Sequence, residues 1–359
     1  MKRYINIVAP GRICLFGDHQ DYLELPVIAC AINRAVHLSS EENTTGQFHI
    51  RMPDIDSERI ISIDDAFISL VPGDHFASAL RVVRRYGCIP DVGFDIELKS
   101  TIPINAGTSS SSAIVVGWIH FLLAAYGCNQ EITSSFIAQL AYEAEVLEHH
   151  SPGGKMDQFT IALGNIIYID TSKSFSYESI GTEMQGLILG VSGIPKKTIG
   201  LLGELRGKAQ EAVAQVKVAR PGFNLGQATL EDIEPLSKYI SEALRPYFYA
   251  AIKNHDITLK AKEHFGKKSP DLKIVGKLMN AHHKVLKEVL KITVPRIDAM
   301  ISAALDAGAY GAKIVGSGGG GSIVALAAAK NKGSVVAAIK EAGAVDAYEV
   351  AVAKGTRIQ

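Results

Sequence analysis

The sequence has few cysteines, and none has the spacing of a zinc site. Only four occur in 359 residues, they lie far apart, and they form no Cys-x-x-Cys pair: Cys14, Cys30, Cys88 and Cys128. This usage argues against a structural zinc site and against a secreted, disulfide-rich fold. It is typical of the reducing cytoplasm, where we expect this protein to be located.

An excess of either charge is also missing. The chain contains 37 Lys and Arg residues and 37 Asp and Glu residues. No overall field therefore draws it to nucleic acid or to an anionic membrane. We expect a small-molecule partner and neither a nucleic-acid nor a membrane partner; the choice between monomer and homodimer stays open.

No apolar segment is long enough to span a bilayer. The longest, 113–128, is shorter than the ~20 residues required and contains His120, so it predicts a buried helix. The first apolar segment ends at Pro10-Gly11, which makes it too short for the hydrophobic region of a signal peptide. The chain is long enough for two domains, each with its own core.

Apolar periodicity predicts a mixture of strands and helices. Strands are expected at 4–8, 12–16, 48–52, 60–63, 166–169 and 187–191, and helices near 74–86, 133–149 and 295–307. The alternating segment 92–99 predicts an edge or half-exposed strand.

A Ser-rich stretch stands between this last strand and the apolar helix. It runs from Pro103 to Ala113 and contains Gly107, Thr108 and then four consecutive serines. Backbone N–H groups at the positive end of a helix bind phosphate, so the stretch predicts a phosphate-binding loop. The alternative is a flexible linker or a simple N-cap, but the position between a strand and a buried helix favours the phosphate loop.

Two other polar stretches have the composition of a binding site. Residues 17–22 carry two carboxylates, an imidazole and an amide, which would bind the hydroxyls of a polyol; the alternative is a solvated turn. Asp157 follows a Pro-Gly-Gly break, where glycine lets a ligand approach the backbone; the alternative is a helix N-cap.

Glycines are also concentrated at 316–321. They match the spacing G-x-G-x-x-G, but the chain then continues as a strand, which argues against a dinucleotide fingerprint. The glycines are better explained by backbone that lies against a neighbouring loop or a phosphate; a plain hairpin is the alternative. A Walker A motif is absent from the sequence.

Three of these stretches, in this order, resemble the signature motifs of the GHMP kinases, the superfamily of galactokinase, homoserine kinase, mevalonate kinase and phosphomevalonate kinase. They are 10–22, 103–113 and 313–322. Residues 153–159 are similar to the galactokinase motif Cys-Gly-x-Met-Asp-Gln-Phe, so the resemblance spans nearly the whole chain.

Within the superfamily, the sequence is most similar to galactokinase and related sugar kinases. Their first motif reads approximately Gly-Arg-x-Asn-Leu-Ile-Gly-Glu-His-x-Asp-Tyr. It is matched here by Arg12, Asp18 in place of Glu, His19, Asp21 and Tyr22. The resemblance implies an α+β fold of two domains, 1–183 and 184–359, with the active site in the cleft between them.

The resemblance also implies an ATP-dependent, Mg²⁺-dependent sugar kinase that acts at a hydroxyl, by analogy the anomeric C1 hydroxyl. Asp157 would orient or deprotonate this hydroxyl, while Arg12 would keep Asp157 ionised and neutralise the transferred phosphoryl group. Ser111 and Glu145 would bind magnesium. Further residues would bind the nucleotide phosphates (Gly107, Ser109, Ser110, Ser111 and Ser112) and the sugar (Asp18, His19, Asp21 and Gly154). Lys313 is left without a role.

Departures from the galactokinase pattern keep the acceptor open. Leu23-Glu24-Leu25 replaces the usual Asn-Gly-Gly, and 192–197 stands in place of a Tyr-Asn-x-Arg-Arg segment. Another aldose, a uronic acid or a sugar phosphate would be compatible, and Lys155, Lys196 or Lys197 could meet an anionic group. The remaining alternatives are a kinase of the mevalonate or heptose type, a related decarboxylase that phosphorylates transiently, and a catalytically silent sugar sensor.

Overall fold

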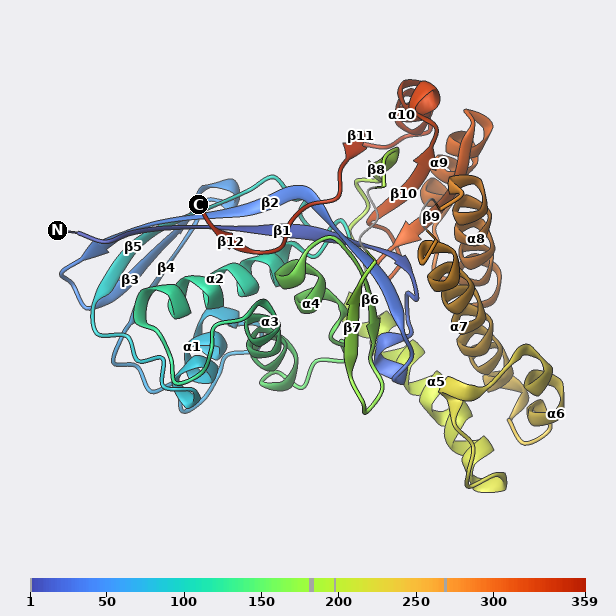
Figure 1. Ribbon diagram of the computed structural model, residues 1–359, viewed down its shortest axis with the longest axis horizontal. Coiled ribbons are helices and arrows are strands. Elements are labelled where there is room, and N and C mark those ends of the chain that lie inside the picture. The colour runs from blue at the N-terminus through green and yellow to red at the C-terminus, as the bar shows by residue number, and fades with distance from the viewer. Residues whose placement is uncertain (1, 181–183, 197, 268–269) are drawn as a thin grey trace.

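The computed structural model describes residues 2–180, 184–196, 198–267 and 270–359. In these residues the chain forms two β-sheets with helices packed against them (Figure 1). The larger sheet has the order β12-β1-β2-β5-β3-β4, with β6 paired to β2 and β7 to β6; the smaller has the order β11-β8-β10-β9. The class is α+β, as predicted.

The strands of the larger sheet are β1 (Tyr4–Phe16), β2 (Val27–Asn43), β3 (Gln47–Met52), β4 (Ser57–Ser62), β5 (Gly93–Ser100), β6 (Ile166–Asp170), β7 (Ser176–Ser179) and β12 (Arg357–Ile358). Those of the smaller sheet are β8 (Leu187–Val191), β9 (Ala309–Val315), β10 (Ser322–Ala327) and β11 (Asp346–Val350). The α-helices are α1 (His75–Arg85), α2 (Ser110–Tyr126), α3 (Ser134–Tyr142), α4 (Met156–Leu163), α5 (Thr198–Ala219), α6 (Ile233–Ser237), α7 (Arg245–Phe265), α8 (Leu272–Lys284), α9 (Pro295–Asp306) and α10 (Lys332–Glu341).

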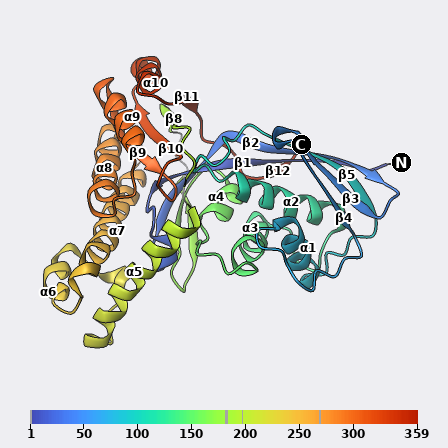
Figure 2. The same ribbon diagram turned by 180° about the vertical axis from the view of Figure 1, so that it is seen from behind.

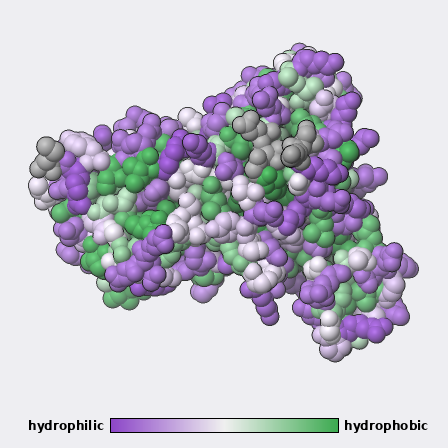
Figure 3. Space-filling model, in the orientation of Figure 1, coloured by the Kyte–Doolittle hydropathy of each residue, from purple (hydrophilic) through white to green (hydrophobic). Residues whose placement is uncertain are grey.

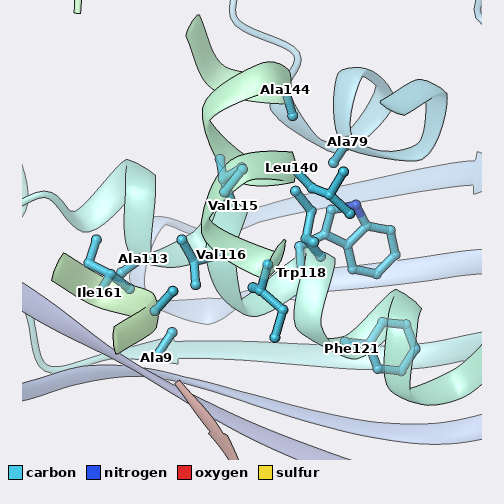
Figure 4. Close-up of a cluster of buried hydrophobic side chains, with 14 of the residues drawn as sticks. Ala9, Ala79, Ala113, Val115, Val116, Trp118, Phe121, Leu140, Ala144 and Ile161 are labelled. Atoms are coloured by element: carbon cyan, nitrogen blue, oxygen red, sulfur yellow. The ribbon is translucent and has the colours of Figure 1, made fainter. Parts of the chain in front are cut away.

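Helices α1 to α4 pack on one face of the larger sheet, and α2 lies between the sheet and its neighbours. Helix α2 is apolar around most of its circumference because the sheet lies on one side and helices lie on the other. Ala9 of β1 packs near Val116 of α2, while Trp118 and Phe121 extend the same core (Figure 4). This packing fixes the N-terminus of α2 relative to β1.

Helices α9 and α10 pack on the outer face of the smaller sheet (Figure 2). Helix α8 packs against β9, and α7 packs against α8. The end of the chain returns to the larger sheet, where Ile358 pairs with Ile7. The predicted domain boundary falls at residues outside the described ranges, so it stays a prediction.

Local differences from the predicted elements have identifiable causes. The strands expected at 4–8 and 12–16 form one strand, β1, because pairing with β2 continues through Pro10 and Gly11 with a register shift. Strand β5 lies between β2 and β3 with alternating burial, so it is the half-exposed alternative and is not an edge. The helix expected at 133–149 ends as α3 at Tyr142 and continues as a π-helical turn, Glu143–Leu147.

On the face seen in Figure 3, hydrophilic residues surround the apolar patches. Among the described residues, no helix combines the length and the apolar character needed to cross a membrane.

Candidate active site

Arg12 and Asp157 form the centre of the site. The guanidinium of Arg12 on β1 donates from Nε to Asp157 Oδ1 at 2.7 Å and from Nη2 to Oδ2 at 2.8 Å. Its Nη1 donates to the carbonyl of Gly107 at 2.6 Å. This planar, two-point contact holds a carboxylate in one orientation. It joins β1, the loop before α2 and the start of α4.

Asp157 is the second residue of α4 and not its N-cap, which is Lys155, so the N-cap alternative is wrong. Ser109 Oγ donates a further hydrogen bond to Oδ2 at 2.5 Å. Burial by itself would raise the pKa of Asp157, but the Arg12 charge and these hydrogen bonds hold it below its usual value. The carboxylate is therefore ionised at neutral pH.

The Ser-rich stretch is the start of α2, so the linker alternative is wrong. Helix α2 begins at Ser110, and Ser109 before it has a left-handed backbone with φ 58°. The loop lies against the glycine-rich turn 316–321, since a Cβ atom would lie 3.2 Å from Gly107 Cα if built at Gly316 and 3.1 Å from Ala106 O if built at Gly321. These contacts confirm the prediction that the glycines allow close approach to a neighbouring loop.

Glu145 lies beside this helix start, on the π-helical turn. Its Oε1 accepts hydrogen bonds from Ser112 Oγ at 2.9 Å and Ser111 Oγ at 3.3 Å, and Oε2 accepts one from Gln158 at 2.7 Å. Burial and the neighbouring Asp157 charge raise the pKa of Glu145. A cation would relieve this repulsion, and hydroxyl and carboxylate oxygens suit magnesium.

Three of the polar residues 18–21, namely Asp18, His19 and Asp21, lie at the same site, whereas the Gln20 side chain bonds to Ala251 and Thr258 of α7. Asp18, His19 and Gln20 are buried, so the solvated-turn alternative is wrong. His19 Nδ1 lies 3.1 Å from Tyr22 OH, and burial lowers the pKa of His19 to about 4, which leaves the ring neutral. The carboxylate of Asp18 contacts Lys313 at 2.6 Å. Its predicted sugar contact stays a prediction.

Asp21 faces the Pro-Gly-Gly break before α4. A Cβ atom at Gly154 would lie 2.2 Å from Asp21 Oδ2, so only glycine leaves room for this carboxylate. Burial and the Asp157 charge raise the pKa of Asp21 to about 6. The carboxylate of Asp21 thus lies close enough to that of Asp157 for the two charges to repel, and of the two it is Asp157 that pairs with Arg12.

Two adjoining cavities are lined by these residues. One, of 170 Å³, lies between Arg12, Asp21, Glu145 and Asp157; we call it the acceptor cavity, after the role predicted for these residues. The other, of 220 Å³, is lined by apolar residues and by the loop before α2; we call it the nucleotide cavity, after the role predicted for that loop. Both cavities are lined by Ser109, Ser111 and Lys196. The apolar residues of the nucleotide cavity are Val36, Met52, Ile55, Leu98, Ile104 and Ile114.

The three lysines suggested for an anionic group differ in position. Lys196 lines both cavities, whereas Lys155 packs over the rings of Tyr142 and Phe175. Lys197 lies outside the described residues. A larger cavity, of 870 Å³, lies between β6, α5 and α7 and has a different lining, apart from Tyr22.

Comparison with known proteins identifies the family. The model of the GHMP kinases N terminal domain matches residues 74–165, and that of the GHMP kinases C terminal domain matches 261–345. The galactokinase galactose-binding signature matches 2–39. The chain is a GHMP kinase.

Relatives of this GHMP kinase include two kinds of enzyme. A mevalonate kinase of Thermococcus sibiricus is 27% identical over 98% of this chain and 97% of that protein. A galactokinase of Exiguobacterium sibiricum is 28% identical over 89% of this chain and 83% of that protein. The chain is thus a phosphotransferase with an alcohol group as acceptor, in a family that uses ATP.

Solved structures confirm the predicted two-domain fold. Lactococcus lactis galactokinase complexed with galactose has a TM-score of 0.87 at 22% identity, over 99% of this chain and 95% of that one. Methanococcus jannaschii mevalonate kinase has a TM-score of 0.72 at 21% identity, over 98% and 99%.

Sequence reasoning missed part of this GHMP kinase's site. The apolar wall of the nucleotide cavity comes from segments as distant as Met52 and Ile114, which share no sequence spacing that would signal a site. The ion pair of Lys313 was also missed, although a lysine within an otherwise apolar strand pattern was a usable signal.

Proposed function

We propose that this GHMP kinase transfers the γ-phosphate of ATP to a hydroxyl of a neutral sugar. The observation that carries the proposal is the acceptor cavity, where the ionised Asp157 is held by Arg12 and faces a second carboxylate, Asp21. Each step of the transfer can be assigned to residues of the two cavities.

ATP would lie in the nucleotide cavity, with its base against the apolar wall. Its phosphates would meet the backbone N–H groups of Gly107 and of Ser109 to Ser112, where the dipole of α2 favours negative charge. Mg²⁺ would be held by Ser111 and Glu145 and would supply neutralisation of the phosphate charge. Phosphates and water would complete its coordination.

Asp157 would orient the acceptor hydroxyl and accept its proton as the new O–P bond forms and the bond between the γ-phosphorus and the ADP oxygen breaks, which releases ADP. Its lowered pKa keeps it ionised, and its hydrogen bonds to Arg12 and Ser109 fix its direction. Arg12 uses three of its five N–H donors on Asp157 and Gly107, which leaves two for the transferred group. Lys196 would add a second positive charge, since it lines both cavities.

The acidic lining favours a neutral acceptor. Asp21, Glu145 and Asp157 all line the acceptor cavity, where burial and, after it, the Asp157 charge raise the pKa values of Asp21 and Glu145. A carboxylate or phosphate on the acceptor would add to this repulsion. Sugar hydroxyls would instead donate to Asp21 and bond to His19, and Gly154, which leaves room for the Asp21 carboxylate, would border the sugar. By analogy with galactokinase, the phosphorylated position would be C1.

Two further properties stay predictions. A cytoplasmic location fits the four free cysteines, of which three are buried. The choice between monomer and homodimer remains open.

A kinase of the mevalonate type is the second candidate, because mevalonate kinases match nearly the full length of the chain. The test is ATP consumption by the wild-type protein with Mg²⁺ and a panel of neutral aldoses, hexuronates, sugar phosphates and mevalonate. Phosphorus NMR then identifies the phosphorylated position. We expect turnover on a neutral aldose with a product phosphorylated at C1. Turnover restricted to mevalonate or to a sugar phosphate would overturn the proposal, and no turnover on any member would indicate a silent sensor.

A further inference from the structure

Lys313 is a fully buried lysine in the middle of β9. Its Nζ donates to the carbonyls of Cys14 at 2.9 Å and Ile314 at 2.8 Å, and it contacts Asp18 Oδ2 at 2.6 Å. Two of the three ammonium donors are thus used on backbone carbonyls, and the Asp18 carboxylate supplies the opposite charge. Lys313 thereby joins the smaller sheet to the segment that leaves β1.

Asp18 is almost fully buried and is engaged through both carboxylate oxygens. Oδ1 accepts a hydrogen bond from the backbone N–H of Gly316 at 3.2 Å, and Oδ2 faces Lys313. His282 Nδ1 lies 3.9 Å from Oδ2, but burial lowers the pKa of His282 to about 3, so its ring is neutral. Among the described residues that contact Asp18, the charge opposite the carboxylate is therefore Lys313.

Asp18 itself lines the acceptor cavity, and so do the residues next to this ion pair. His19 follows Asp18, and Ser317 follows Gly316. His19 has a left-handed backbone with φ 63°, which a residue with a side chain adopts only when its surroundings hold it there. Ser317 Oγ is buried without a hydrogen-bond partner in the described structure, which leaves it free to bond to a group in the cavity.

We propose that Lys313 is a positioning residue: it holds Asp18 as an internal anchor and thereby fixes His19 and the 316–317 turn against the acceptor. This inference rests on the proposed function. Asp18 lines the cavity, but its carboxylate would be held by Lys313 and the Gly316 N–H, and the direct contacts on this wall would be made by His19 and Ser317.

The test compares Lys313→Met, Asp18→Asn and the double variant, each in the full chain with the acceptor that the panel identifies. Lys332→Met is the matched control, because Lys332 also belongs to the C-terminal part and pairs with Glu349 at the surface. We expect each single variant to raise the acceptor KM by about tenfold or more, since small misplacements of positioning groups are costly. The KM for ATP should stay within about threefold.

The double variant and a set of deoxy sugars decide between anchoring and direct contact. If Asp18 is an internal anchor, the acceptor KM of the double variant should be no higher than that of either single variant, because both substitutions break the same ion pair. An internal anchor also predicts that Asp18→Asn raises KM by the same factor for every monodeoxy analogue of the acceptor. The proposal would be overturned if the increases in acceptor KM multiplied in the double variant. It would also be overturned if the increase caused by Asp18→Asn disappeared for one deoxy analogue, which would show that Asp18 contacts the sugar.

Misfolding of a variant and failure of the sugar assignment can each be distinguished from failure of this proposal. If Lys313→Met does not fold, Asp18→Asn and the double variant carry the test, since the double variant leaves no unpaired charge. If the panel selects an acceptor other than a neutral sugar, the sugar assignment fails. The same KM comparison with that acceptor, and with its analogues that lack one hydroxyl, still decides the role of Lys313.

Discussion

Replacing Asp157 by Asn removes one negative charge with little change in shape. The carboxylate accepts two hydrogen bonds from Arg12, at 2.7 and 2.8 Å, and one from Ser109 at 2.5 Å. The amide has one acceptor oxygen and one NH₂ group. At least one of these three donors would then face another donor, and the buried Arg12 would lose its counter-charge.

These contacts determine how much the substitution should lower the free energy of unfolding. A hydrogen bond to a charged group contributes ~1.5–3 kcal/mol, and the amide oxygen retains part of the network. We therefore expect Asp157→Asn to lower the free energy of unfolding by about 2–3 kcal/mol, measured by urea denaturation. The depressed pKa of Asp157 means that its contribution is full above pH ~4 and is lost only as the pH falls through the folded-state value. The loss should thus be constant between pH 7 and 8, above the pKa of Asp21, which the Asp157 charge helps to raise to about 6.

Turnover should fall much more than stability. Loss of a general base lowers kcat by ~10²–10⁴-fold, whereas nucleotide affinity, measured by calorimetry, should change by less than about threefold. Asp346→Asn is the matched control: Asp346 forms a surface ion pair with Lys340 at 3.0 Å, so its effect on stability should stay within ~0.5 kcal/mol. If Asp157→Asn kept more than about a tenth of wild-type turnover, the role of Asp157 as base would be refuted.

Three further changes test other parts of the site. Gly154→Ala places a methyl group 2.2 Å from Asp21 Oδ2, so the acceptor KM should rise about tenfold or more with an unchanged KM for ATP in steady-state assays. The pKa of Asp21 is about 6, so the acceptor KM should fall between pH 5 and 7 as Asp21 becomes ionised. The free energy of unfolding should also fall over pH ~4 to 6, because in this range Asp21 keeps its proton in the folded state and loses it in the unfolded state. Asp21→Asn should remove both trends. Glu145→Gln should raise the Mg²⁺ concentration for half-maximal rate about tenfold without changing the acceptor KM.

Local features of the site were predictable from the sequence. The serines before α2 and the glycines at 316–321 lie in short stretches whose composition already restricts the backbone, and the structure places them as a helix start and a close loop contact. Helix α1 was predicted for the same reason, since the apolar spacing that indicates it lies within one segment.

Long-range pairings were not predictable from spacing. Arg12 and Asp157 are separated by 145 residues, and only the resemblance to a family placed them together. The π-helical turn that carries Glu145 has the same apolar pattern as an α-helix, so periodicity extended α3 through it. The pairing of β12 with β1 involves two residues at the end of the chain, which is too short a segment to give a strand pattern.

The central claim is that this GHMP kinase acts on a neutral sugar through Asp157, beside the carboxylate of Asp21. The most direct test is the ratio of kcat/KM for a neutral aldose to kcat/KM for mevalonate, at the same ATP and Mg²⁺ concentrations. Like-charge repulsion in the acceptor cavity predicts a preference for the aldose of at least about a hundredfold. A preference for mevalonate of similar size would contradict the claim.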